Sequence, residues 1–105
     1  MTMAQLYSPE TLQLTITGLL ADSWAVKLVR ALSQNRMRFS ALQHDLGISS
    51  KTLSARLKEL EKEGLISRTL YAQVPLRVEY ELTDKGYEFN ELLDQIGKWE
   101  KKWKN

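Results

Sequence analysis

The sequence predicts a mostly α-helical protein that carries one small β-hairpin. Two observations support this fold class. Apolar residues recur at helical spacing through most of the 105 residues, and the period then changes at 77–82, where Val78, Tyr80 and Leu82 alternate with charged residues. The length suits one domain, and we find no internal repeat or linker, so we assign residues 1–105 to a single domain.

Two helices are expected in the first third of the chain. Ser8-Pro9-Glu10 begins the first, because serine caps helices, proline suits the first helical position and an acid favours the positive end of the helix dipole. Threonines and a glycine weaken this helix, and we expect it to end near residues 18–21. Asp22 or Ser23 can cap the second helix, which continues to about Leu32.

A short helix, a turn and a longer helix follow at about residues 40–63. Ser40 and Gln43 form a capping-box pattern that predicts the start of the short helix, and Gly47 ends it. One of the serines at 49–50 caps the longer helix. Two helices of these lengths joined by a glycine-containing turn form a helix-turn-helix, whose second helix can lie in the major groove of DNA.

The remaining elements are a hairpin and a long helix. Residues 65–71 and 77–82 are rich in strand formers and enclose a loop of about five residues, which predicts a two-stranded antiparallel hairpin. The short stretch 37–39 could be a minor strand. A last helix at about 83–104 places apolar residues on one face across about five turns.

The longer helix at about 50–63 has an outer face that suits DNA. Leu53, Leu57 and Leu60 mark its buried side, and the opposite side carries lysines and small residues. Small or hydroxyl residues can approach base edges, and basic residues can reach phosphates. The alternative is the charged face of an ordinary solvated helix. The residues of this helix and its cap that we predict to contact DNA are Ser49, Ser50, Lys51, Thr52, Ser54, Ala55, Arg56 and Lys58.

Positive charge is concentrated in the same part of the chain, although the net charge is only +2. Residues 36–58 hold five basic residues and one acid, and residues 65–77 hold two basic residues and no acid, so the rest of the chain carries a net −4. Phosphate binding requires such a concentration. The hairpin can then act as a wing along the DNA. The predicted contacts from the wing and its flank are Arg38, Arg68, Gln73 and Arg77.

The last helix extends its apolar face almost to the end of the chain. A helix of this length can outreach the core of a small domain, and exposed tryptophans on one stripe indicate a partner surface. A second copy is the expected partner, because paired DNA readers match a two-fold axis to palindromic DNA. The alternative is that the helix folds back over its own domain. The predicted dimer-interface residues are Leu12, Ile16, Phe89, Leu92, Leu93, Ile96, Trp99 and Trp103.

The composition excludes several classes of function. Cysteine is absent, which excludes disulfides, thiol catalysis and cysteine-ligated zinc. The single histidine, His44, has no catalytic partners and is expected to face solvent, so we expect no enzyme, metal site or cofactor. No apolar run is long enough to span a membrane, and no signal peptide is evident, so we expect a cytoplasmic protein.

Several motifs resemble the HxlR-type winged-helix regulators, within the broader MarR/ArsR-like group. They are Trp24, Arg38-Phe39-Ser40, Gly47-Ile48-Ser49, and the Pro-x-x-Val-Glu-Tyr-x-Leu-Thr pattern at 75–83. The resemblance covers about residues 12–99. It implies a bacterial or archaeal transcription regulator that binds operator DNA as a homodimer. It also implies that residues 50–63 form the recognition helix, that the loop around Pro75 is the wing tip, and that the terminal helices form the dimer interface.

The chain departs from the family pattern in two places. Some members sense oxidants through a cysteine, and this chain has none. Many members have Gly-Lys-Trp where this chain has Asp22-Ser23-Trp24. A small-molecule effector is left open, because no residue points to one. The alternative function is a winged-helix protein-interaction module that does not bind DNA, with the Trp99 and Trp103 face as its working surface.

Overall fold

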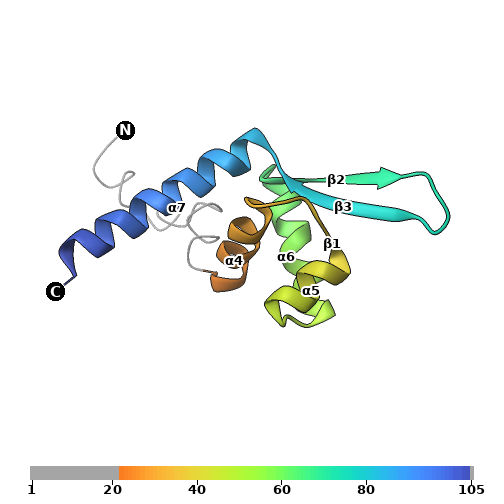
Figure 1. The fold of residues 1–105 in the computed structure, drawn as a ribbon, viewed down its shortest axis with the longest axis horizontal. Helices are drawn as coiled ribbons and strands as arrows, with labels where there is room; N and C mark the ends of the chain where they lie inside the picture. Colours follow the sequence, from red (N-terminus) through yellow and green to blue (C-terminus); the bar gives the residue numbers. More distant parts are fainter. Residues whose placement is uncertain (1–21, 105) are drawn as a thin grey trace, which may run out of the picture.

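The computed structural model describes residues 22–104, so the predicted first helix, with Leu12 and Ile16, lies outside the described residues. Within residues 22–104 the fold is mostly helical with a small antiparallel sheet, as predicted (Figure 1). The elements, in chain order, are α4 (Ser23–Leu32), β1 (Met37–Arg38), α5 (Phe39–Leu46), α6 (Ser50–Lys62), β2 (Ile66–Tyr71), β3 (Arg77–Leu82) and α7 (Asp84–Trp103).

The core lies between α4, α5 and α6 and is closed by the base of the hairpin and the start of α7. Leu53, Leu57 and Leu60 of α6 are buried, as their spacing predicts, and they belong to one apolar cluster with Leu28 of α4 and Leu42 of α5. Burying each such side chain contributes roughly 1.5–3 kcal/mol. The apolar side of α6 is therefore turned inward, and its opposite side is left for solvent or a ligand.

Side chains cap three of the four helices in residues 22–104, namely α4, α6 and α7, and α5 lacks such a cap. Asp22 caps α4 and Ser49 caps α6 through side-chain oxygens that accept backbone N–H groups. The prediction that Ser40 caps α5 is wrong, because α5 begins at Phe39 and its N-cap, Arg38, makes no side-chain cap bond. Arg38 is the last residue of β1 and has an extended backbone, so strand pairing decides where α5 begins.

Gln43 consequently does not complete a capping box. Its amide nitrogen instead donates a hydrogen bond to the Ser50 hydroxyl across 2.8 Å. This contact joins α5 to the first turn of α6, on either side of Gly47, which takes a left-handed backbone conformation with φ of 62°. The two helices of the helix-turn-helix are thus linked by a side chain as well as by their turn.

The sheet contains the predicted hairpin and one further strand. β2 and β3 pair antiparallel from Ile66 opposite Leu82 to Tyr71 opposite Arg77, which leaves the five-residue loop 72–76 between them. β1 pairs antiparallel with the other edge of β3, so the sheet has three strands in the order β1-β3-β2 and not two. The hairpin projects away from the helices as a wing (Figure 1).

The start of α7 is held against the turn between α6 and β2. The Thr83 hydroxyl donates to the Gly64 carbonyl and accepts the Gly86 N–H, and the Thr83 N–H donates to the Leu65 carbonyl at 3.1 Å. Gly86 is buried, and a Cβ built there lies 2.1 Å from the Leu65 carbonyl oxygen. Only glycine fits this contact, so Gly86 allows α7 to begin directly against the hairpin.

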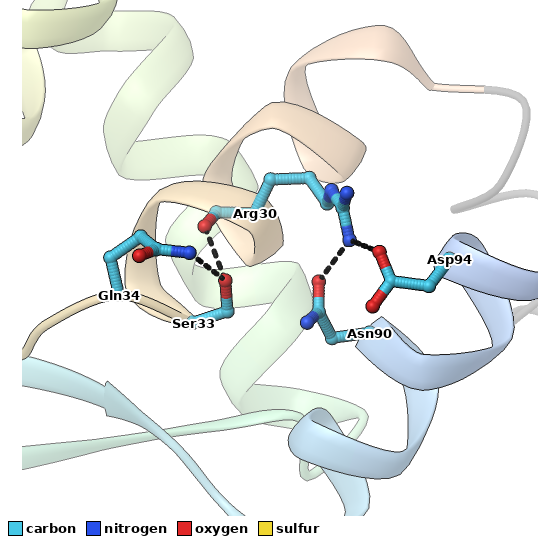
Figure 2. Close-up of polar contacts among 5 residues, drawn as sticks. All are labelled: Arg30, Ser33, Gln34, Asn90 and Asp94. Carbon is cyan, nitrogen blue, oxygen red and sulfur yellow. Dashed lines mark hydrogen bonds and ion pairs between the residues drawn. The ribbon is translucent and has the colours of Figure 1, made fainter. Parts of the chain in front are cut away.

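Farther along, α7 is tied to α4 by a polar cluster. The guanidinium of Arg30 donates to the Asn90 amide oxygen at 2.9 Å and forms an ion pair with Asp94 (Figure 2). On the other side of the cluster, the Ser33 hydroxyl donates to the Arg30 carbonyl at 2.6 Å (Figure 2). The C-terminal end of α7 extends away from α4, α5 and α6 (Figure 1).

Candidate nucleic-acid interface

The outer face of α6 matches the predicted DNA-contacting face in exposure. Ser50, Lys51, Ala55 and Lys58 are exposed, as is the cap residue Ser49. Thr52, Ser54 and Arg56 are half-buried at the flanks. Small and hydroxyl side chains thus occupy the first two turns, where close approach to base edges requires them.

The hydroxyls at the start of α6 are already engaged with one another. The Ser49 hydroxyl accepts the Thr52 N–H at 3.2 Å and donates to the Thr52 hydroxyl at 3.0 Å. The Ser50 hydroxyl accepts the Gln43 amide. This network holds the first turn of α6 in place, while Lys51 and Ala55 remain exposed.

Three of the basic residues predicted to contact DNA have no carboxylate partner among residues 22–104. Lys51 and Lys58 are exposed on α6, and Arg38 is exposed at the end of β1. None of them lies within ion-pair distance of a described acid. Their charges therefore remain available to phosphate groups.

Arg56 is held inside the protein. Its Nε lies 2.7 Å from Asp22 Oδ2, and its Nη1 lies 3.6 Å from Glu59 Oε1. Both side chains of the Asp22 pair are mostly covered, with 28% of Arg56 and 24% of Asp22 exposed. The contact gives Asp22 a second role, as the partner of Arg56, that sequence analysis did not find, beside the predicted cap of α4.

The wing carries less free positive charge than its own residues suggest. Arg77 lies 3.3 Å from a Glu79 carboxylate oxygen and covers the Tyr71 ring, with 4.2 Å between the guanidinium carbon and the ring centroid. Arg68 lies 3.9 Å from Glu61, with both side chains about half exposed. Counting charge over residues 65–77 missed these acids because Glu79 and Glu61 lie outside that segment.

Arg36, the residue before β1, extends this cluster across β2 and β3. Its Nη1 donates to the Tyr71 hydroxyl at 2.9 Å, and its guanidinium lies 3.5 Å from Glu81 and 4.0 Å from Glu79. The hydrogen bond to Tyr71 raises the pKa of Arg36, and the Glu81 carboxylate raises this pKa further. We call Arg36, Tyr71, Arg77, Glu79 and Glu81 the wing brace.

The wing tip itself is apolar. Val74 is fully exposed and Leu76 is 62% exposed, while Gln73 is the exposed polar side chain beside them. The tip therefore presents a hydrogen-bonding amide and apolar surface, with the guanidinium of Arg77 engaged behind it.

The predicted interface on α7 divides into a buried part and an exposed part. The prediction that Phe89 lies in the dimer interface is wrong. Phe89 is 5% exposed and belongs to the core of its own chain, so it is not available to a second copy. Leu93 is half-buried and packs against the same core. The residues that remain exposed are Leu92, Ile96, Trp99 and Trp103.

The part of the chain that the structure describes holds no candidate metal site near these surfaces. Residues 22–104 contain no group of three or more histidine and acidic side chains that could hold a metal ion. His44 is exposed on α5, as expected. In the same residues, each helix is either too short or too polar to cross a membrane.

Comparisons with known proteins agree on the type of fold. The family model described as HxlR-like helix-turn-helix matches residues 19–105. The uncharacterized HTH-type transcriptional regulator YvaP of Bacillus subtilis is 40% identical over 86 residues, which span 81% of this chain and 80% of YvaP. The uncharacterized HTH-type transcriptional regulator BH0655 of Halalkalibacterium halodurans is 39% identical over 84 residues, which span 78% of this chain and 74% of BH0655.

Two solved structures show the same arrangement. The reduced form of the transcriptional regulator YodB from B. subtilis superimposes with a TM-score of 0.80 at 27% identity, covering 90% of this chain and 92% of YodB. A MarR-family regulator from Enterococcus faecalis V583 superimposes with a TM-score of 0.81 at 30% identity, covering 97% of this chain and 94% of that protein.

Proposed function

The chain belongs to the HxlR-like helix-turn-helix family of transcriptional regulators, and from this we propose that it binds operator DNA as a homodimer. Helix α6 enters the major groove, and the wing lies along the minor groove or the backbone. The observation that carries the proposal is the outer face of α6, where unpaired lysines flank small side chains opposite a buried leucine stripe.

The contacts divide into those that provide affinity and those that provide specificity. Lys51, Lys58 and Arg38 bind phosphates, because they are exposed and have no carboxylate partner among the described residues. The small side chains of α6 lie at base edges: Ser50, Thr52, Ser54 and Ala55. Ser49 presents the start of α6 to a phosphate.

The wing contributes through Gln73 at its tip and Arg68 at its base. Arg68 is more than 3.5 Å from its carboxylate partner and half exposed, so a phosphate can replace Glu61 at little cost. Arg77 is the weaker candidate, because DNA contact requires it to leave both Glu79 and the Tyr71 ring.

A second copy covers the exposed apolar stripe of α7, formed by Leu92, Ile96, Trp99 and Trp103. These large side chains are 47–68% exposed along a single helix face, which suits a self-complementary surface for a two-fold dimer. Pairing two α6 helices in this way lets the protein read two half-sites of a palindrome.

The test is fluorescence anisotropy against DNA from upstream of the protein's own gene, with a scrambled duplex as control. If the dimer neutralises about six to ten phosphates, affinity falls roughly 10³- to 10⁵-fold between 50 and 200 mM salt. We expect tighter binding to the upstream DNA. Absence of DNA binding even at low salt contradicts the proposal and favours a protein-interaction module.

Two substitutions separate the proposed roles. Lys58→Ala should weaken binding to both duplexes alike and lower the salt slope by about one for each protomer. Ser54→Ala should reduce the preference for the upstream DNA and leave the slope unchanged. Lys98→Ala, which removes the same charge from α7, is the control for Lys58. Identical effects of the Lys58 and Ser54 substitutions would contradict the division of roles.

The proposed operator binding and the bacterial relatives of the chain support a cytoplasmic protein of a bacterial or archaeal cell. The neighbour HypR is described as a redox regulator, but a thiol-based signal has no counterpart here because the chain contains no cysteine. Any effector of this protein must therefore act without cysteine chemistry.

A further inference from the structure

We propose that Arg56 is a positioning residue, which Asp22 holds so that the recognition helix α6 keeps its orientation on α4, and that it is not a phosphate contact. The inference rests on the proposed DNA-binding function. The charge of Arg56 and its place in the recognition helix predicted a DNA contact, and the proposal replaces that role. It also gives a function to Asp22, where the chain departs from many members of its family.

The carboxylate of Asp22 uses its two oxygens for two different helices. Oδ1 accepts the backbone N–H groups of Trp24 at 2.9 Å and Ala25 at 3.0 Å, which caps α4. Oδ2 lies 2.7 Å from Nε of Arg56 in the middle of α6. Because the first oxygen is fixed by the backbone of α4, the position of the second is fixed as well.

The guanidinium of Arg56 is directed away from the outer face of α6. Lys51, Ala55 and Lys58 occupy that face and are exposed, whereas Arg56 is on the flank toward α4, with about a quarter of its side chain exposed. Glu59, one turn farther along α6, lies 3.6 Å from Nη1 of Arg56. Two carboxylates therefore surround this cation, and a phosphate would have to displace Asp22 to bind it.

The apolar contacts of α6 do not by themselves fix its orientation precisely. Leu53, Leu57 and Leu60 pack into the core, but burial of apolar surface is non-directional. Nε of Arg56 is covered and lies 2.7 Å from Asp22 Oδ2 without being aligned for a hydrogen bond, so the two groups form a close ion pair. The attraction between such charges depends on the distance between them. The Asp22–Arg56 pair thus restricts rotation and sliding of α6 against α4, and with it the placement of the small side chains at base edges.

The experiment compares variants of the full-length protein for binding to operator and scrambled DNA over a series of salt concentrations. Asp22→Asn keeps the cap, because asparagine caps helices as well as aspartate does, and removes the charge that holds Arg56. Arg56→Gln removes the other partner. The double variant tests whether the two residues act together. Asp45→Asn removes one exposed acid from α5 and controls for the change in net charge.

We expect Asp22→Asn and Arg56→Gln to weaken operator binding by a similar factor, roughly two- to fivefold for each protomer, and to lower the preference for operator over scrambled DNA. The double variant should be no weaker than either single variant. The salt slope should stay that of the unsubstituted protein. Asp45→Asn should leave the preference unchanged.

If Arg56 instead binds a phosphate, the expected results are the opposite. Arg56→Gln would then lower the salt slope by about one for each protomer, as Lys58→Ala does. Arg56→Lys would keep most of the affinity, since lysine binds phosphate as a point charge but does not reproduce the arginine geometry. Asp22→Asn would release Arg56 and tighten binding. Any of these results overturns the proposal.

Thermal unfolding followed by circular dichroism separates a loss of folding from a loss of DNA binding. Binding is measured at a temperature at which every variant is folded, and Arg56→Lys serves if Arg56→Gln does not fold. Failure of the unsubstituted protein to bind DNA refutes the proposed function. A lower salt slope for Arg56→Gln in a protein that binds DNA refutes only the positioning role.

Discussion

Replacing Gly86 with alanine tests how closely α7 approaches the hairpin. The added Cβ would lie 2.1 Å from the Leu65 carbonyl oxygen and 3.2 Å from the Leu82 Cβ, whereas real Cβ atoms stay at least 3.0 Å from such neighbours. The first atom is backbone and cannot rotate away. The start of α7 must therefore move, which strains the Thr83 N–H bond to the same carbonyl.

The magnitude follows from three contributions. Forcing an extra methyl group into a packed site costs about 1–3 kcal/mol. Weakening the hydrogen bond to Leu65 adds up to about 1 kcal/mol. Alanine offsets up to about 1 kcal/mol, because it is a better helix former than glycine. We expect a net loss of about 1–3 kcal/mol in the free energy of unfolding, equivalent to roughly 4–8 °C in Tm for each kcal/mol in a domain of this size.

Gly97 supplies the matched control. It lies in the same helix, but a Cβ built there meets no atom of residues 22–104 within 4 Å. Gly97→Ala should therefore stabilise the protein by up to about 1 kcal/mol. Urea and thermal unfolding at one protein concentration measure both variants. If Gly86→Ala is as stable as the unsubstituted protein, the close approach of α7 to Leu65 is wrong.

Three further predictions concern the cap of α7, the proposed dimer surface and the wing brace. Thr83→Ala removes the α7 cap and the bond to the Gly64 carbonyl and should cost about 1–2 kcal/mol in urea unfolding, whereas Thr83→Ser should keep both. Alanine at both Trp99 and Trp103 should raise the dimer dissociation constant at least about tenfold in sedimentation equilibrium; an unchanged constant rules out this face. Tyr71→Phe removes the hydroxyl that binds Arg36 and should cost under about 1 kcal/mol, and a larger loss would mean that the hydroxyl has another role.

The features that were predictable from sequence are those set by local periodicity. The buried side of α6 follows from the spacing of Leu53, Leu57 and Leu60, and the structure confirms it. The hairpin follows from the alternation of apolar and charged residues at 77–82. The short loop at 72–76 then limits the possible registers of the two strands. The exposed face of α6 is the complement of its buried side, so its residues were predictable too.

The features that were not predictable depend on partners far away in the chain. α5 begins one residue before Ser40 because Met37 and Arg38 pair with β3. Arg56 meets Asp22, and Arg36 meets Tyr71, only after the chain has folded. A charge count over a segment assumes that its charges are free, and this assumption fails for Arg77 because Glu79 lies two residues along on the same strand face.

The wing brace has a consequence for the entropy of association. Arg36, before β1, contacts Tyr71 on β2 and Glu79 and Glu81 on β3, so the long side chains on this face of the hairpin are ordered by the protein itself. A loop that becomes ordered only on contact loses conformational freedom at that moment, which subtracts from the affinity. Here most of that loss accompanies folding. On the proposed function, the hairpin meets DNA with the side chains of Arg36 and Arg77 already held in place, and these two arginines provide rigidity rather than charge.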